Sequence, residues 1–71
     1  MEITKEIEQK LRERTRALTC KYFTPMRRIA IEIGVDRDKA YYTVSRWLHD
    51  MCKLTDTQLI ALDAFLSERG F

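Results

Sequence analysis

The stretch that decides the fold is residues 29–48, IAIEIGVDRDKAYYTVSRWL. Apolar side chains recur before Gly34 at the three-and-four spacing of one helical face, at Met26, Ile29, Ala30 and Ile33. Thr24 and Pro25 precede them, and threonine can cap free N–H groups while proline suits the first helical position. Gly34 adopts positive φ without steric strain and so ends a helix well. The pattern predicts a helix over residues 25–33 and a sharp turn at Gly34.

A second helix is predicted directly after this turn. Val35 can pack back on the helix that has just ended, and Asp36 can cap the helix that follows. The next apolar positions again fit a 3.6-residue period, at Ala40, Tyr41, Val44, Leu48 and Met51. We therefore expect one continuous helix over residues 37–50, with Tyr41 and Trp47 in the core.

The face of this helix opposite Val44 is polar and mostly basic. Its members are Lys39, Tyr42, Thr43, Arg46, His49 and Asp50. A helix fits the major groove of B-DNA, where Arg can donate two hydrogen bonds to guanine and Thr or Tyr can meet bases or phosphates. The other interpretation is an ordinary surface helix whose polar face is only solvated.

These residues resemble the helix-turn-helix of phage Cro and repressor proteins and, more closely, of lambda-type phage transcription activators. The matching positions, within about residues 25–66, are Ala30, Gly34, Val35, Asp36, Ser45, Arg46 and Trp47. The resemblance implies a sequence-specific regulator of transcription, of phage or mobile-element origin, that binds double-stranded DNA in the cytoplasm of a bacterial host cell. It also implies dimers or tetramers on repeated half-sites.

One departure from that pattern affects the choice of DNA-contacting residues. Ser45 lies ten residues after Val35, farther than in those families by about one helical turn, so the recognition helix is predicted to be lengthened. Anchoring the pattern on Gly34-Val35 makes the base-reading residues Arg37, Asp38 and Lys39. Anchoring it on Ser45-Arg46 makes them Tyr42, Thr43 and Arg46. We favour the set that would share one face of a continuous helix, which is Lys39, Tyr42, Thr43 and Arg46.

The net charge of +2 is unevenly divided along the chain. Residues 1–20 carry five basic and four acidic groups, residues 21–53 carry seven and four, and residues 54–71 carry one and three. Lys and Arg displace the counterions of DNA, so the positive excess of the middle segment favours phosphate contact. The predicted DNA-binding residues are Arg27, Arg28, Arg37, Lys39, Tyr42, Thr43, Arg46, His49 and Lys53.

One further helix is expected before residues 25–50 and one after them. The first covers residues 3–22, with an apolar stripe at Ile3, Ile7, Leu11, Leu18 and Tyr22. The second half of this helix carries the basic residues Arg14, Arg16 and Lys21. These side chains either are only solvated or contact the DNA backbone. The first turns of this helix are also a candidate contact with a second subunit.

The last helix is expected over residues 56–69. Thr55 and Gln58 have the spacing of a capping box, and Gly70 suits the end of the helix. The stripe of Leu59, Leu62, Phe65 and Leu66 is predicted to be core. A dimer surface that includes Ile60, Ala61 and Phe71 is the alternative.

Seventy-one residues make one small all-α domain, a four- to five-helix bundle over residues 1–71, near the size at which oligomerisation helps stability. No apolar run approaches the roughly 20 residues of a membrane span, and the charged start is unlike a signal peptide, so we expect a soluble intracellular protein. Cys20 and Cys52 are expected to stay reduced. His49 and Cys52 offer only two of the four ligands that structural zinc needs.

No catalytic constellation, cofactor motif or small-molecule site is visible in the sequence. There is no glycine loop that would cradle phosphate, and the only histidine has no identifiable nucleophile and carboxylate partner. We therefore expect a protein that is not an enzyme. The alternative to DNA binding is a small helical protein-interaction module or phage-encoded inhibitor that uses Tyr42, Trp47 and the apolar helices on a partner protein.

Overall fold

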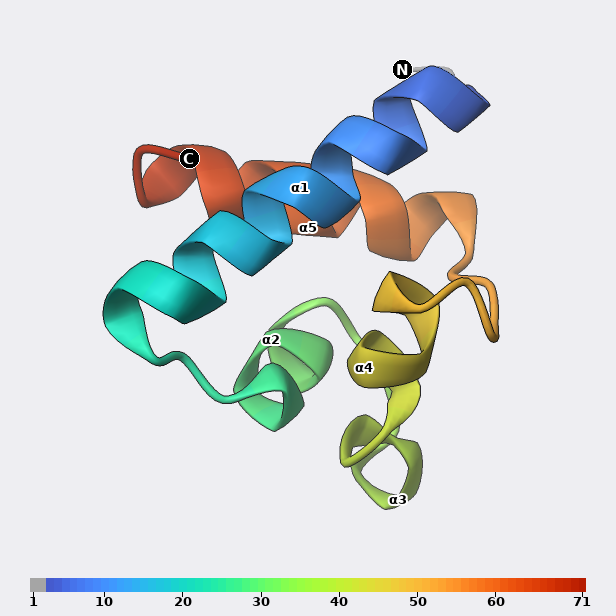
Figure 1. Ribbon diagram of the computed structural model, residues 1–71. Helices are drawn as coiled ribbons and strands as arrows, with labels where there is room; N and C mark the ends of the chain where they lie inside the picture. The colour runs from blue at the N-terminus through green and yellow to red at the C-terminus, as the bar shows by residue number, and fades with distance from the viewer. Residues whose placement is uncertain (1–2) are drawn as a thin grey trace.

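Five α-helices make up the described part of the chain, residues 3–71 of a computed structural model (Figure 1). In chain order they are α1 (Lys5–Tyr22), α2 (Met26–Glu32), α3 (Arg37–Ala40), α4 (Thr43–Leu48) and α5 (Asp56–Glu68). The two long helices, α1 and α5, pack against each other, and the three short helices lie beneath them in Figure 1. No strand occurs within residues 3–71, so the prediction of a small all-α bundle is confirmed.

The two long helices begin at threonine caps. The Thr4 side chain accepts a hydrogen bond from the Ile7 N–H at 3.2 Å. At α5, the Gln58 N–H donates to the Thr55 hydroxyl at 3.1 Å, and the Thr55 N–H donates to the Gln58 side chain at 3.0 Å. The predicted capping box is therefore confirmed.

The start of α2 differs from the prediction. Pro25 occupies the N-cap position, α2 begins at Met26, and no side chain caps its free N–H groups. A capping side chain reaches these groups from the N-cap residue itself, and Thr24 lies one position earlier. The predicted Thr24 cap is therefore wrong. Asp36, although it stands at the N-cap of α3, makes no side-chain cap either.

The predicted turn at Gly34 is present and has a specific hydrogen-bond pattern. Gly34 has φ +93°, its N–H donates to the Ile31 carbonyl at 3.1 Å, and the Val35 N–H donates to the Ala30 carbonyl at 2.9 Å. This is a Schellman motif, which satisfies two of the last carbonyls of the helix. Val35 packs back into the core as expected.

The core contains residues from all five helices and from the connections after α2 and α4. Its buried hydrophobic members are Leu11, Leu18, Ile29, Ala30, Ile33, Val35, Ala40, Val44, Trp47, Leu48, Leu54, Leu59, Leu62, Phe65 and Leu66. Trp47 is completely buried, and the predicted core stripe of the last helix is confirmed. Three predicted apolar positions are wrong, because Tyr22, Tyr41 and Met51 are exposed, Tyr41 to 80 %.

The continuous helix over residues 37–50 is also wrong. Helix α3 ends at Ala40 and α4 begins at Thr43, because Tyr42 leaves the helical region at φ −128° and ψ −12°. Tyr41, Tyr42 and Thr43 are aromatic or β-branched residues, which lose side-chain freedom in a helix. The Thr43 hydroxyl donates to the Lys39 carbonyl at 2.5 Å, an acceptor that the backbone N–H of Thr43 would use in a continuous helix.

The second helix also stops earlier than predicted. Helix α4 ends at Leu48, and Asp50 follows in the left-handed region at φ +57°. The Asp50 N–H donates to the Trp47 carbonyl and the Met51 N–H donates to the Arg46 carbonyl, at 3.0 and 2.8 Å. This is the same motif that ends α2, with an aspartate in the glycine position. Aspartate tolerates this conformation better than most residues.

Candidate functional site

The break between α3 and α4 separates the two registers considered for DNA contact. Arg37 and Lys39, which belong to the register counted from Gly34-Val35, lie on α3. Tyr42, Thr43 and Arg46, which belong to the register counted from Ser45-Arg46, lie at or within the first turns of α4. The argument that Lys39 and Arg46 share one face of a single helix therefore fails, and the candidate site is a surface built from α2, α3 and α4.

On α2 and α3 the burial pattern directs the cations outward. Ile29 and Ala30 are completely buried, and the neighbouring Arg27 and Arg28 are exposed. Ala40 is completely buried at the end of α3, while Arg37 and Lys39 are exposed. The Gly34 turn joins these two helices, which pack against each other. Four of the predicted DNA-binding residues thus stand on two helices that meet at one tight turn.

Tyr42 and Arg46 are brought directly together at the start of α4. The Arg46 N–H donates to the Tyr42 carbonyl at 2.9 Å, so the two residues are one helical turn apart. The Arg46 guanidinium carbon lies 4.4 Å from the centre of the Tyr42 ring, which is the geometry of a cation–π contact. Tyr42 is 41 % exposed, so the pair is presented at the surface.

The other three predicted DNA-binding residues differ from one another in exposure and in position. Thr43 is half-buried and its hydroxyl already donates to Lys39, which leaves its lone pairs as acceptors. His49 is exposed just beyond the end of α4. Lys53 is exposed in the connection to α5 and lines a hollow formed with α1 and α5.

The cations of this region make no ion pair within the described residues, although Arg46 contacts the Tyr42 ring. We call them the basic surface: Arg27, Arg28, Arg37, Lys39, Arg46 and Lys53. Within residues 3–71, none of their side chains makes an ion pair or a hydrogen bond. Two exposed carboxylates, Asp36 and Asp38, balance the charge of Arg37 and Lys39 around α3. The positive excess of the surface therefore comes from α2, α4 and the connection to α5.

The arginines of α1 are in a different situation from the one predicted. Arg14 donates to the Phe71 carbonyl and to Asp63 at 2.6 Å each, and to the Ser67 hydroxyl at 3.1 Å. Arg16 donates to the Leu48 carbonyl at 2.6 Å. Arg14 is half-buried and uses three of its nitrogens within the fold, whereas Arg16 is exposed and uses one. Lys21 lies over the rings of Tyr22 and Phe71.

Arg12 ties α1 to the end of α4. Its Nε donates to the Trp47 carbonyl at 3.0 Å, and its Nη2 donates to Glu8 at 3.0 Å and to Asp50 at 3.2 Å. Glu8 also accepts from the Trp47 indole N–H at 3.0 Å. Arg12 and Arg16 together supply donors to two of the last carbonyls of α4, an arrangement that complements the negative end of the helix dipole.

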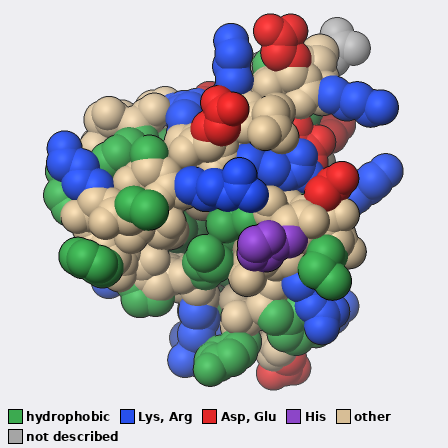
Figure 2. Space-filling view, viewed as in Figure 1, with side chains coloured by type: hydrophobic (Ala, Val, Ile, Leu, Met, Phe, Trp, Pro, Cys, Tyr) green, Lys and Arg blue, Asp and Glu red, His purple; other side chains and the backbone are tan. Residues whose placement is uncertain are grey.

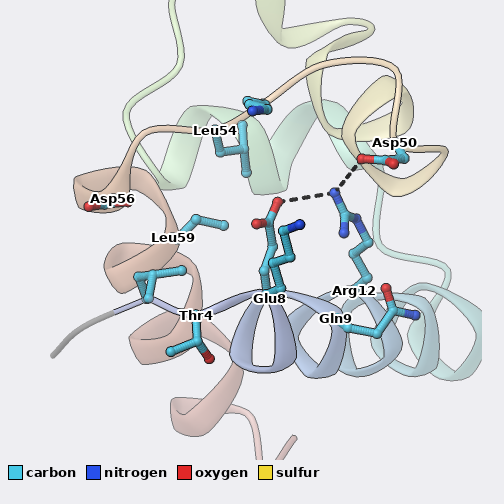
Figure 3. A pocket seen from close by; sticks show the side chains of 11 residues that line it. Thr4, Glu8, Gln9, Arg12, Asp50, Leu54, Asp56 and Leu59 are labelled. Carbon is cyan, nitrogen blue, oxygen red and sulfur yellow. Dashed lines mark hydrogen bonds and ion pairs between the residues drawn. The ribbon is translucent and has the colours of Figure 1, made fainter.

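This network forms one wall of a hollow of about 620 Å³ between the first turns of α1, the α4–α5 connection and the start of α5. Figure 3 shows Arg12 between Glu8 and Asp50, with Leu54 and Leu59 opposite. None of the lining residues comes from α2 or α3. The polar groups that Figure 3 joins by dashed lines bind each other, and the hollow lies between α1, the α4–α5 connection and α5.

Sequence reasoning missed a set of exposed aromatic side chains. Phe23 is 87 % exposed and takes the left-handed conformation, at φ +52°, directly after α1. Tyr22 packs edge-on against Phe71, and Tyr41 projects at the break between α3 and α4. Figure 2 shows hydrophobic and basic side chains side by side over the lower part of this face, around α3 and α4, and most of the acidic side chains visible there over α1. Helical periodicity could not have found Tyr41, because it falls on the apolar stripe of a helix that is not continuous.

No group of three or more His, Cys, Asp or Glu side chains within residues 3–71 is placed to hold a metal ion. None of the described helices combines the length and the apolar character needed to cross a membrane. No family model, curated protein or solved structure matches this chain. Function must therefore be inferred from the side chains of the α2–α4 segment.

Proposed function

We propose that this chain is a sequence-specific regulator of transcription that binds double-stranded DNA through the basic surface. In this proposal α3 and the first turn of α4 approach the major groove, and Arg27 and Arg28 of α2 contact the phosphate backbone. Phosphate contacts hold the register, while side chains that reach base edges supply sequence preference. Arg46 is the residue we assign to base contact.

The observation that carries this proposal is that the arginines of α1 bond to groups of the fold, whereas the cations of the basic surface do not. The α1 arginines Arg12, Arg14 and Arg16 all bind groups of the fold, whereas the basic surface makes no ion pair or hydrogen bond within residues 3–71. Cations without an intramolecular partner keep their full capacity to displace counterions from DNA. Four of these cations, Arg27, Arg28, Arg37 and Lys39, stand on the two helices that the Gly34 turn joins.

The acidic residues around α3 limit how tightly this surface binds DNA without sequence preference. Asp36 and Asp38 offset Arg37 and Lys39, so the non-specific electrostatic attraction is modest. A carboxylate near a base edge can accept from the amino group of cytosine, which favours some sequences over others. We therefore expect weak non-specific affinity at physiological salt and a measurable preference among sequences.

A selection of bound sites from random duplex DNA tests the proposal. We expect an enriched motif, and two half-sites about one helical turn apart if the protein binds as a dimer. Fluorescence anisotropy on the selected duplex should show affinity that falls steeply with added salt. The absence of any duplex binding at low salt would reject the proposal.

A protein partner is the second candidate, and the exposed aromatic residues favour it. Phe23 and Tyr41 are 87 % and 80 % exposed, and aromatic side chains are enriched in protein–protein interfaces. Trp47, which the sequence-based form of this alternative would use, is completely buried and cannot contact a partner. A partner interaction that is lost with Phe23→Ser and Tyr41→Ser, but is retained with Lys39→Ala and Arg46→Ala, would favour this function over DNA binding.

A further inference from the structure

The Tyr42 ring is in contact with the one base-reading arginine that we assign on α4. The ring centre lies 4.4 Å from the Arg46 guanidinium carbon, and no other aromatic ring within residues 3–71 makes this contact with Arg46. The Tyr42 carbonyl also accepts the Arg46 N–H at 2.9 Å. Backbone and side chain therefore hold the two residues in one arrangement at the beginning of α4.

The usual helical partner of Arg46 is held elsewhere. Asp50 follows Arg46 by four residues, the spacing at which opposite charges pair on a continuous helix. Helix α4 ends at Leu48, however, and Asp50 takes the left-handed conformation and binds Arg12 at 3.2 Å. The early helix end, together with Arg12, thus leaves the hydrogen-bond donors of Arg46 without a carboxylate.

The ring contact and the missing carboxylate have complementary effects on Arg46. A cation–π contact holds the guanidinium to the ring yet leaves its N–H groups as donors for two parallel hydrogen bonds. Restricting the side chain before binding lowers the entropy lost when those bonds form. Guanine O6 and N7 in the major groove are the acceptors that match such a pair of donors.

We infer that Tyr42 is a positioning residue, which orients Arg46 for a bidentate contact with a guanine and makes no base contact of its own. This inference rests on the proposed DNA binding and deepens it, because it assigns a guanine-containing target and separates the roles of two residues that the sequence grouped together. The aromatic ring carries the effect, and the Tyr42 hydroxyl does not.

Two variants of Tyr42 separate the ring from the hydroxyl. Tyr42→Phe keeps the ring and is expected to bind the selected duplex like the unmodified protein. Tyr42→Leu removes the ring and is expected to raise Kd about two- to fivefold, the range of an exposed cation–π contact. It should also weaken discrimination at the same guanine that Arg46→Ala affects. In the Arg46→Ala background, Tyr42→Leu should have no further effect.

A second measurement reports the contact in the free protein. The Arg46 side-chain protons near the Tyr42 ring should show upfield ring-current shifts in NMR spectra. These shifts should persist in Tyr42→Phe and in the matched control Tyr41→Leu, and disappear in Tyr42→Leu. Thermal unfolding of each variant checks that the fold is retained.

The possible outcomes distinguish the inference from the function on which it depends. If the unmodified protein binds no duplex, the proposed function and the inference both fail. If it binds DNA and Tyr42→Phe loses as much affinity as Tyr42→Leu, the hydroxyl contacts DNA directly and only the inference is overturned. Equal affinities of the Leu variant and the unmodified protein, or Arg46 shifts unaffected by loss of the ring, overturn it as well.

Discussion

Two groups of cations in this molecule have opposite uses. Arg12, Arg14 and Arg16 of α1 reach across to α4, to α5 and to the Phe71 carbonyl. The basic surface on α2, α3, α4 and the following connection makes no such bonds within residues 3–71. Both groups look alike in the sequence, since each is a set of basic residues at polar positions, and all but Lys53 lie on helices.

The difference shows that a count of charges does not locate a binding surface. Residues 1–20 carry five basic groups, and three of these bind inside the fold. An arginine whose donors are occupied by carbonyls and carboxylates offers little to a phosphate. The relevant quantity for DNA binding is therefore the number of cations that remain without a partner after folding.

Replacing Arg12 with Met should destabilise the protein strongly. The Arg12 side chain is 11 % exposed, and its loss leaves Glu8 and the Trp47 carbonyl without their charged donor. We expect the free energy of unfolding to fall by about 2–3 kcal/mol, measured by urea denaturation. Asp50→Asn is the control and should change it by less than about 0.5 kcal/mol, because Asp50 is 85 % exposed. Unchanged stability of Arg12→Met would show that α1 is not held by its arginines.

Replacing Arg46 with Ala tests the other group. We expect affinity for the selected duplex to fall by about 1–3 kcal/mol, the range of one bidentate base contact, and preference at one base pair to relax. Urea denaturation should give stability within about 0.5 kcal/mol of the unmodified protein, because Arg46 is an exposed side chain. A large loss of stability in Arg46→Ala would remove the distinction between the two groups.

Gly34→Ala tests the turn that joins α2 and α3. Gly34 has φ +93°, and no atom lies within 4 Å of where a Cβ would be, so the substitution adds backbone strain without a clash. We expect a loss of about 1–2 kcal/mol in the free energy of unfolding. Gly70→Ala creates the same strain at the end of α5, where fraying relieves it, and should have a smaller effect. Equal losses at the two glycines would argue against a rigid turn at Gly34.

Of the four substitutions, Lys39→Gln should have the smallest effect, and that effect should be on DNA affinity alone. It removes one charge from the basic surface, so Kd should rise by a similar small factor for every duplex, and the slope of log K against log salt should decrease by about 0.9. Stability should not change. A sequence-dependent effect of Lys39→Gln would instead indicate that α3 reads bases, as in the register counted from Gly34-Val35.

The sequence predicted most of the local structure. Helix content, the capping box at Thr55 and Gln58, and the glycine turns at Gly34 and Gly70 all follow from interactions between residues a few positions apart. The predicted bounds of the first, second and last helices agree with the structure to within two residues. The buried position of Trp47 was also predicted correctly.

The errors that affect the candidate site lie in residues 37–51, where local preferences compete. Periodicity placed Tyr41 and Met51 on the apolar face of one helix. The break at Tyr41-Tyr42-Thr43 leaves Tyr41 exposed, and the end of α4 at Leu48 leaves Met51 outside the helix and exposed. Asp50 ends α4 in a conformation that glycine usually supplies, so the sequence contained no strong stop signal there. Part of the candidate site lies on this segment, so the single helical face predicted for it is divided between α3 and α4.

The sequence by itself determined where the two long helices start and where the chain turns at Gly34, because caps, glycine turns and amphipathic stripes act within about one helical turn. Only the tertiary structure decided which cations remain without partners. Arg12 finds the Trp47 carbonyl 35 residues away, and Arg14 finds the Phe71 carbonyl 57 residues away. Such bonds depend on how helices pack against each other, which no short-range pattern contains. The chain thus specified its basic residues, and the packing of α1 against α4 and α5 determined which of them remain exposed and free.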